Sequence, residues 1–181
     1  MVPEQVITVF GSARSRAGEA EYEQALALGQ ALARNGFAVC TGGYGGIMEA
    51  VSRGAKEARG KTYGVTTEFF SRQANAWIDV ELRKRTWEER LFSLVRMGKG
   101  FVACPGGTGT LLELALVWEM QNKAVIDWKP LTVLGDFWCP VLDRVLEVEP
   151  EALARLVHCS RTAEEAARFF VEQLRKGKEE R

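Results

Sequence analysis

The sequence predicts an α/β fold in which an open parallel sheet of six or seven strands carries helices on both faces. Short apolar runs alternate with longer amphipathic segments along the chain, which is the pattern of repeated strand–helix units. Two glycine clusters, at residues 42–46 and 106–109, each follow an apolar run and precede an amphipathic segment. This arrangement is typical of Rossmann-like folds. The chain has 181 residues with no linker or repeat, so we expect a single Rossmann-like domain over residues 1–181.

The first half of the chain contains three strand–helix units. Its expected strands are short apolar or β-branched runs at residues 6–10, 37–41 and 62–66. The helices between them are expected at residues 19–35 and from the first glycine cluster to about residue 59. Gly36 and Gly60 follow these two segments, where glycine commonly ends a helix.

The second half resumes the alternation after an irregular stretch. Residues 68–85 have no regular period and mix aromatic with charged side chains, so we expect a long loop or a short helical piece that covers a site. The run Thr86-Trp87-Glu88-Glu89 has capping-box spacing and should open a helix that reaches about residue 97. The remaining strands are expected at residues 101–104 and 131–134, and the remaining helices at residues 110–122, 141–146 and from Thr162 onward.

Charge, hydropathy and cysteine content narrow the classes of partner. Lys plus Arg and Asp plus Glu number 24 each, so no basic field favours nucleic acid and a small-molecule partner is expected. No apolar run approaches the ~20 residues that cross a bilayer, so no membrane partner is expected. The cysteines form no C-x-x-C pair and no apolar signal segment follows the N-terminus, which predicts a cytoplasmic protein. The single histidine, His158, lies at an expected strand end and is interpreted as structural.

Both glycine clusters stand between an expected strand and an expected helix. There the first amides of the helix and its dipole form an anion site, and glycines let the backbone approach the anion closely. Because the carboxyl ends of parallel strands share one edge of the sheet, both loops should meet at one site. The alternative is that strand–helix turns use glycine for geometry alone.

Two better-known phosphate motifs are absent. Neither cluster completes G-x-G-x-x-G, because Met48 and Leu112 occupy the last positions, so the sequence lacks a dinucleotide fingerprint. Gly60-Lys61-Thr62 resembles the end of a P-loop, but Ala55 stands where the first glycine is needed. That triplet also precedes an expected strand, whereas a P-loop precedes a helix.

The second cluster belongs to a longer motif, Pro105-Gly106-Gly107-Thr108-Gly109-Thr110-Leu111-Leu112-Glu113. This motif resembles, at every fixed position, the P-G-G-x-G-T-x-x-E of the LOG family, the cytokinin riboside 5′-monophosphate phosphoribohydrolases. The first cluster is similar in part to the family's G-G-G-x-x-G-L-M-G, from which it differs at Tyr44 and Glu49. Arg90 falls where the family's Arg-Lys pair begins, but Leu91 replaces the lysine. Phe10-Gly11-Ser12 at the end of the first strand adds to the resemblance.

The resemblance implies a nucleotide-binding hydrolase that cleaves the N-glycosidic bond of a purine nucleoside 5′-monophosphate. Its substrate would be AMP or an N6-modified AMP, and its products the free base and ribose 5-phosphate. The resemblance further implies Arg90 and Glu113 as catalytic residues, no metal or other cofactor, and a homodimer or higher homo-oligomer. Family members are often labelled lysine decarboxylase-like, but the chain lacks the size and the Schiff-base lysine setting of a pyridoxal enzyme. The implied substrate-binding residues are Gly11, Ser12, Gly43, Gly45, Gly46, Met48, Pro105, Gly106, Gly107, Thr108, Gly109 and Thr110.

The residues themselves leave alternatives open for both catalytic candidates. Thr110-Leu111-Leu112-Glu113 also has capping-box spacing, in which the glutamate only bonds the start of its own helix. Arg90 follows Glu88 and Glu89, and its ordinary role would be that of an exposed salt-bridge partner.

Further alternatives concern the first glycine loop and the whole chain. Glu49 is either a second catalytic acid or, as we favour, a charge that complements the positive end of its helix. Tyr44 either stacks on a base or fills space, and the five tryptophans are interpreted as core and interface residues. The alternatives to a hydrolase are a non-catalytic nucleotide- or molybdenum-cofactor-binding protein and a purely structural domain that forms dimers.

Overall fold

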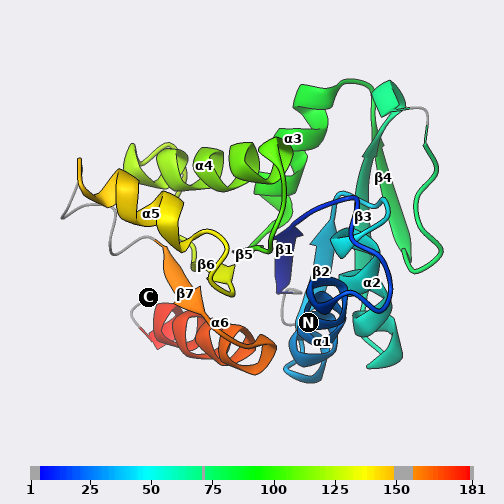
Figure 1. Cartoon of the computed structure of the whole chain (residues 1–181), viewed down its shortest axis with the longest axis horizontal. Coiled ribbons are helices and arrows are strands. Elements are labelled where there is room, and N and C mark those ends of the chain that lie inside the picture. Colours follow the sequence, from blue (N-terminus) through cyan, green and yellow to red (C-terminus); the bar gives the residue numbers. More distant parts are fainter. Residues whose placement is uncertain (1–4, 71, 149–156, 180–181) are drawn as a thin grey trace.

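The computed structural model describes residues 5–70, 72–148 and 157–179. The strands of this part of the chain form one seven-stranded parallel sheet in the order β4-β3-β2-β1-β5-β6-β7 (Figure 1). The prediction of an α/β, Rossmann-like fold is therefore confirmed. The strands are β1 (Val6–Phe10), β2 (Ala38–Thr41), β3 (Thr62–Thr67), β4 (Val80–Lys84), β5 (Gly100–Ala103), β6 (Leu131–Leu134) and β7 (His158–Ser160).

The helices cover both faces of the sheet. Residues of α1, α2 and α6 belong to the buried cluster on one face, and residues of α3, α4 and α5 to the cluster on the other (Figure 1). A short 3₁₀ helix, η1, spans Glu68–Phe70. The α-helices are α1 (Ala20–Arg34), α2 (Ile47–Glu57), α3 (Trp87–Met97), α4 (Thr108–Asn122), α5 (Cys139–Leu146) and α6 (Ala163–Glu179).

The strand order creates a switch point beside β1. The chain steps outward from β1 through β2 and β3 to β4, and then returns to place β5 on the other side of β1. In register, Thr8 of β1 pairs with Cys40 of β2 and with Phe101 of β5. The two glycine loops follow β2 and β5, so both emerge at carboxyl ends of strands, on the same edge of the sheet. In open α/β sheets this is the edge at which ligands bind.

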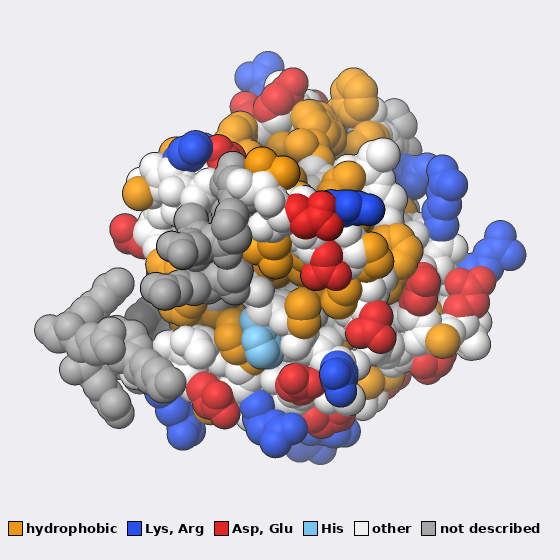
Figure 2. Space-filling view, turned by 60° about the vertical axis from the view of Figure 1, so that its left-hand side comes forward, with side chains coloured by type: hydrophobic (Ala, Val, Ile, Leu, Met, Phe, Trp, Pro, Cys, Tyr) orange, Lys and Arg blue, Asp and Glu red, His pale blue; other side chains and the backbone are white. Residues whose placement is uncertain are grey.

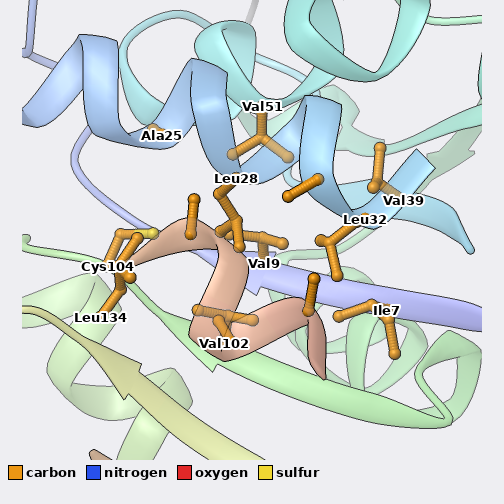
Figure 3. Close-up of a cluster of buried hydrophobic side chains, with 14 of the residues drawn as sticks. Ile7, Val9, Ala25, Leu28, Leu32, Val39, Val51, Val102, Cys104 and Leu134 are labelled. Atoms are coloured by element: carbon orange, nitrogen blue, oxygen red, sulfur yellow. The ribbon is translucent and has the colours of Figure 1, made fainter. Parts of the chain in front are cut away.

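The central strands are buried on both faces, which explains their almost continuous apolar runs. On the face that carries α1, the side chains of Val9, Leu28 and Val102 join strands and helix in one cluster (Figure 3). On the opposite face, the rings of Phe10 and Phe101 stack with their centroids 6.0 Å apart. This two-sided core fixes the strand ends and thereby the loops that follow them.

The irregular stretch at 68–85 contains a strand that the sequence analysis missed. β4 pairs with β3 alone, at one edge of the sheet. Its exposure alternates, with Glu81 and Arg83 on the more exposed side. Charged residues are typical of edge strands, because they discourage pairing with another chain. Because of these charged residues, the sequence of β4 resembles that of a loop, and the strand was not predicted.

Smaller differences concern boundaries and the far edge of the sheet. α4 begins at Thr108 where the sequence predicted residue 110, and α5 begins at Cys139 where it predicted residue 141. The imidazole of His158, at the start of β7, stacks on Phe169 with ring centroids 4.5 Å apart, which supports a structural role. Figure 2 shows the side of the molecule with α5 and β7, where basic and acidic side chains are interspersed.

Candidate active site

A cavity of about 880 Å³ opens at the carboxyl edge of the sheet, beside β1. Its walls come from the loop after β1, the first glycine loop, η1 and the starts of α3 and α4. The residues that line it are Gly11, Ser12, Ala13, Arg14, Tyr44, Met48, Phe69, Phe70, Arg72, Trp87, Arg90, Leu91, Gly107, Thr108, Gly109, Thr110, Leu112 and Glu113.

The second glycine loop presents the open start of a helix to this cavity. Gly107 is the N-cap of α4, and the amide of Leu111 donates to its carbonyl oxygen at 3.0 Å. The amides of residues 108–110 come before the first intrahelical bond and are free to bind a ligand. A Cβ atom added at Gly107 or Gly109 would meet no atom within 4 Å. Packing does not require glycine at these two positions, so close approach of a ligand is the better explanation for them.

The glycines of the first loop have a structural role, set by backbone conformation and close packing. Gly43 and Gly46 have φ angles of 79° and 69°, a backbone conformation that favours glycine. A Cβ atom at Gly46 would also collide with the backbone of Ser12 and Ala13. One at Gly42 would collide with the Arg90 guanidinium. These glycines therefore allow the loops to pack together and leave room for Arg90.

Backbone hydrogen bonds tie the loop after β1 to both glycine loops. The amide of Ser12 donates to the carbonyl oxygen of Pro105 at 3.0 Å, and the carbonyl oxygen of Ser12 accepts from the Ile47 amide at 2.8 Å. Gly11 packs directly against the Ile47 side chain, leaving no room for a Cβ atom. The three loops thus form one connected rim of the cavity.

Arg90 is held rigidly inside this rim. Its side chain is only 8% exposed, and the guanidinium donates from Nε to the Val65 carbonyl at 2.8 Å and from Nη2 to the Gly42 carbonyl at 3.2 Å. The same group lies over the rings of Tyr44 and Phe70, 5.5 Å and 5.8 Å from their centroids. The alternative of an exposed salt-bridge partner is therefore wrong, because the helix directs this arginine inward.

Glu113 lies beside Arg90 in the wall of the cavity. Its Oε1 lies 3.9 Å from Arg90 Nη1, and its side chain is 14% exposed. Burial raises the pKa of this carboxyl from 4.5 to about 7, although the nearby Arg90 charge works in the opposite direction. The carboxyl is thus poised to change its charge near neutral pH.

The capping-box alternative for Glu113 is also wrong. It requires Thr110 at the N-cap, but α4 begins at Thr108 with Gly107 as its N-cap, and no side chain caps this helix. Glu113 therefore lies beyond the first turn of the helix. The Thr110 side chain packs instead against Gly106, which has no room for a Cβ atom.

Three aromatic side chains form part of the cavity lining, which we call the aromatic wall. They are Phe69, Phe70 and Trp87, although the sequence analysis interpreted tryptophans as core or interface residues. Tyr44 fills space beneath Arg90: its hydroxyl accepts from the Thr67 amide at 3.0 Å and donates to the Thr67 carbonyl at 3.3 Å. Two aromatic residues side by side in an aperiodic segment were the available signal for this wall.

Of two residues that depart from the LOG motifs, Leu91 lines the cavity and Glu49 does not. Leu91 is buried and lines the cavity, so an apolar side chain occupies the wall where the resemblance would place a lysine. Glu49 does not line the cavity and lies in the first turn of α2. Burial raises the pKa of the nearby Tyr22 phenol, and the Glu49 charge acts in the same direction. The position of Glu49 in the first turn favours the interpretation that it complements the positive end of its helix.

The cavity gathers most, but not all, of the residues that the sequence analysis named. It brings together both catalytic candidates, Arg90 and Glu113, with most of the binding candidates. The binding candidates that line it are Gly11, Ser12, Met48, Gly107, Thr108, Gly109 and Thr110. Those that support the loops without lining the cavity are Gly43, Gly45, Gly46, Pro105 and Gly106.

Neither a cluster of metal ligands nor a membrane-spanning helix occurs among residues 5–70, 72–148 and 157–179. Within these residues, no group of three or more His, Cys, Asp or Glu side chains is placed to hold a metal ion. No helix in the same part of the chain is long and apolar enough to cross a membrane.

Known proteins resemble this chain in sequence and in fold. The cytokinin riboside 5′-monophosphate phosphoribohydrolase of Mycobacterium marinum is 32% identical over 117 residues, which are 60% of this chain and 62% of that protein. The molybdenum cofactor binding protein of Rippkaea orientalis has the same fold, with a TM-score of 0.80 and 24% identity over 96% of this chain and 99% of that one. The Moco carrier protein of Chlamydomonas reinhardtii has a TM-score of 0.77 and 25% identity over the same shares of 96% and 99%.

A match to a family model shows the family of this chain, which these pairwise similarities alone do not establish. The model describes the SLOG cluster4 family and matches residues 4–153. That range includes both glycine loops, Arg90 and Glu113, and hence the whole rim of the cavity. The chain therefore belongs to the SLOG cluster4 family, as a divergent LOG-like member.

Proposed function

We propose that the protein hydrolyses the N-glycosidic bond of a purine nucleoside 5′-monophosphate, AMP or an N6-modified AMP, to the free base and ribose 5-phosphate. The observation that carries the proposal is the adjacent pair of Arg90 and Glu113, 3.9 Å apart, beside the open helix start of α4. The 32% identity to a phosphoribohydrolase supports it. Base release from such nucleotides, followed by chromatography, tests it.

The phosphate group would bind at the start of α4. The amides of residues 108–110 and the positive end of the helix dipole favour an anion there, and Gly107 and Gly109 leave its approach open. The ribose would then lie toward Glu113, which is farther along the same helix and lines the same cavity. The base would extend to the aromatic wall of Phe69, Phe70 and Trp87, whose rings can stack on a purine.

Glu113 and Arg90 would act as the bond to the base breaks. N-glycosidic cleavage passes through a ribose with oxocarbenium character, which a nearby carboxylate stabilises. The ionised Glu113 is suited to this task and to orienting the attacking water. Arg90 favours the ionised form of Glu113 and supplies a fixed positive charge whose position the Val65 and Gly42 carbonyls set.

The pH profile should follow the ionisation of Glu113. Its pKa is raised to about 7 and the proposed role needs the carboxylate, so kcat/KM for AMP should fall by up to about tenfold per pH unit below that value. Above it the profile should level off. The AMP dissociation constant, measured over the same pH range, shows how ionisation of the nucleotide phosphate and of the site affects binding, so that the effect on turnover can be separated from it. A kcat/KM that is flat or falls as pH rises through neutrality would contradict the assignment.

Gly109→Val should weaken nucleotide binding without disturbing the fold. The added side chain meets no protein atom within 4 Å of its Cβ, yet it would occupy the space in front of the helix start. We expect AMP affinity, measured by calorimetry, to fall by about tenfold or more. Ala20→Val is a matched control, because it adds the same side chain to the exposed first turn of α1, outside the cavity. Equal AMP affinities in the two variants would place the anion site elsewhere.

Non-catalytic binding of a nucleotide or of the molybdenum cofactor is the second candidate function. Similarity of fold to the Moco carrier protein over 96% of the chain supports it, and so does Leu91, which removes a cation from the cavity wall. The lining fits a phosphorylated ligand with a flat ring system, since it combines the α4 start, aromatic rings, Arg14 and Arg72. The two functions differ in one respect: a carrier binds its ligand without releasing a base.

The protein is also proposed to work as a homodimer or higher homo-oligomer in the cytoplasm. Leu111 and Leu112 on α4 are 38% and 39% exposed, and Phe92 of α3 is 38% exposed, although all are large apolar side chains. Leu112 lines the cavity as well, so a partner packed on α4 would border the site. We expect light scattering to give at least twice the 20.1 kDa of one chain, and Leu111→Glu to reduce this mass. A wild-type mass near 20.1 kDa at micromolar concentration would contradict the expectation.

A further inference from the structure

Two cysteines lie close together in space, and neither of them lines the cavity of the candidate active site. Cys139 is the first residue of α5, and Cys159 is the middle residue of β7. Their Sγ atoms are 4.0 Å apart, and Cys159 is exposed while Cys139 is partly exposed. The other two cysteines, Cys40 and Cys104, are buried in the sheet core.

The backbone holds both cysteines at this spacing. Cys159 is registered in the sheet, where it pairs with Val133 of β6. Cys139 directly follows Trp138, whose buried indole donates from Nε1 to the Cys104 carbonyl at 2.9 Å. The backbone on either side of the pair is thus anchored in the fold, which keeps the two sulfur atoms close to each other.

We propose that Cys139 and Cys159 form a reversible disulfide, which makes this pair a redox modification site of the protein. The oxidant is a peroxide. One thiolate attacks an oxygen of hydrogen peroxide, the O–O bond breaks with loss of hydroxide, and the cysteine becomes a sulfenic acid. The second thiolate then attacks that sulfur, the S–O bond breaks, and the hydroxide that leaves takes up a proton to give water. With hydrogen peroxide, two thiols lose two protons and two electrons, and the peroxide becomes two molecules of water. A small dithiol reverses the reaction by thiol–disulfide exchange.

The surroundings leave room for this bond. A disulfide brings the sulfur atoms to about 2.05 Å, so the Sγ atoms must approach each other by about 2 Å. Both cysteines line a small cavity of about 140 Å³ together with Trp118 and Leu142, so the thiols are not packed tightly on every side. The bond would join the start of α5 to the edge strand β7 and close the loop of chain between them.

The buried cysteines Cys40 and Cys104 serve as controls for the reactivity of the Cys139–Cys159 pair. Burial raises the pKa of both the Cys40 and the Cys104 thiols to about 12, so these thiols remain protonated and inaccessible. Burial and the adjacent Cys139 raise the pKa of Cys159 to about 11, and Asp143 and Asp136 act in the same direction. We therefore expect oxidation of the pair to be slow at neutral pH and faster in mildly alkaline buffer.

The test uses the full chain and hydrogen peroxide. After mild oxidation, alkylation in denaturant should label Cys40 and Cys104 but not the pair, and peptide mapping should recover a Cys139–Cys159 link that a small dithiol removes. The oxidised protein should unfold at a temperature roughly 5–10 °C higher than the reduced protein, because the bond closes a loop in the unfolded chain.

Cys139→Ser and Cys159→Ser are the matched variants, and neither should show the link or the thermal shift. Recovery of all four cysteines as alkylated thiols or as sulfinic acids in oxidised wild-type protein would overturn the proposal. So would a link between chains, seen as a doubled mass on a non-reducing gel, in place of the intrachain bond.

Discussion

Glu113→Gln is expected to slow base release by about 10²–10³-fold while changing AMP affinity only slightly. Glutamine keeps the shape and much of the hydrogen bonding of Glu113, but it removes the negative charge. That charge matters most when the ribose becomes positive, so its loss should affect turnover more than binding. Single-turnover base release and calorimetric affinity, measured on the same preparation, separate the two effects. Near wild-type release by this variant would remove Glu113 from the mechanism.

The same variant should be more stable than the wild type at alkaline pH. The folded-state pKa of Glu113 is raised to about 7 from 4.5, so its ionisation lowers the stability of the fold progressively between about pH 4.5 and 7, fully above that range and not below it. Removing the carboxyl should therefore raise the stability by about 1–2 kcal/mol near pH 8 and by little near pH 4.5. Thermal unfolding at both pH values measures this.

Glu119→Gln is the control for both measurements. Glu119 lies on the same helix but is exposed and outside the cavity, with Lys123 3.8 Å away. Surface pairs of this kind contribute little to stability, so neither turnover nor the pH dependence of unfolding should change appreciably. A Glu113→Gln variant that behaved like Glu119→Gln would contradict the account of the carboxyl.

Arg90→Ala is expected to abolish most turnover and to destabilise the protein. The substitution takes away the guanidinium that donates to the buried carbonyls of Val65 and Gly42 and that lies over two aromatic rings. We expect a loss of about 2–4 kcal/mol in the free energy of unfolding and at least about 10²-fold in the rate of base release. Both quantities should be measured, because a stability loss alone does not establish a role in turnover.

Arg90→Lys separates the two roles of this arginine. Lysine restores the charge but not the planar guanidinium that reaches both carbonyls, so stability and rate should recover only in part. In the folded Arg90→Ala protein, the pKa of Glu113 should rise further, because Arg90 now lowers it. The pH profile should therefore shift upward in Arg90→Ala and much less in Arg90→Lys. Arg96→Ala, on the exposed side of α3, is the control, and equal effects of the two alanine variants would contradict the assignment.

The parallel sheet could be predicted because its central strands are apolar on both faces. Burial between two helical layers leaves runs such as residues 6–10 with no polar alternation, and glycine-rich turns mark their carboxyl ends. β4 escaped prediction for the opposite reason, since an edge strand keeps charged side chains on its more exposed side. β4 therefore lacks the continuous apolar run by which the central strands were recognised in the sequence.

The candidate site was predictable where one motif holds both the loop and the side chain. Gly107, Gly109 and Glu113 lie within nine residues of chain, and one helix start brings them to the cavity. The inward direction of Arg90 depends on carbonyls of β3 and of the first glycine loop, which are distant in sequence. The aromatic wall depends in the same way on how residues 68–70 fold over α3, so periodicity alone could not reveal it.

Base release from nucleoside 5′-monophosphates by the wild-type protein tests the central claim most directly. The purified protein is incubated with AMP, an N6-modified AMP and the corresponding nucleosides without phosphate, and the products are separated by chromatography. The account predicts free base and ribose 5-phosphate from at least one purine monophosphate, little release from the nucleosides, and loss of the activity in Glu113→Gln. Tight binding of a monophosphate at the Gly109 site with no base released from any of these nucleotides would contradict the hydrolase and favour a carrier.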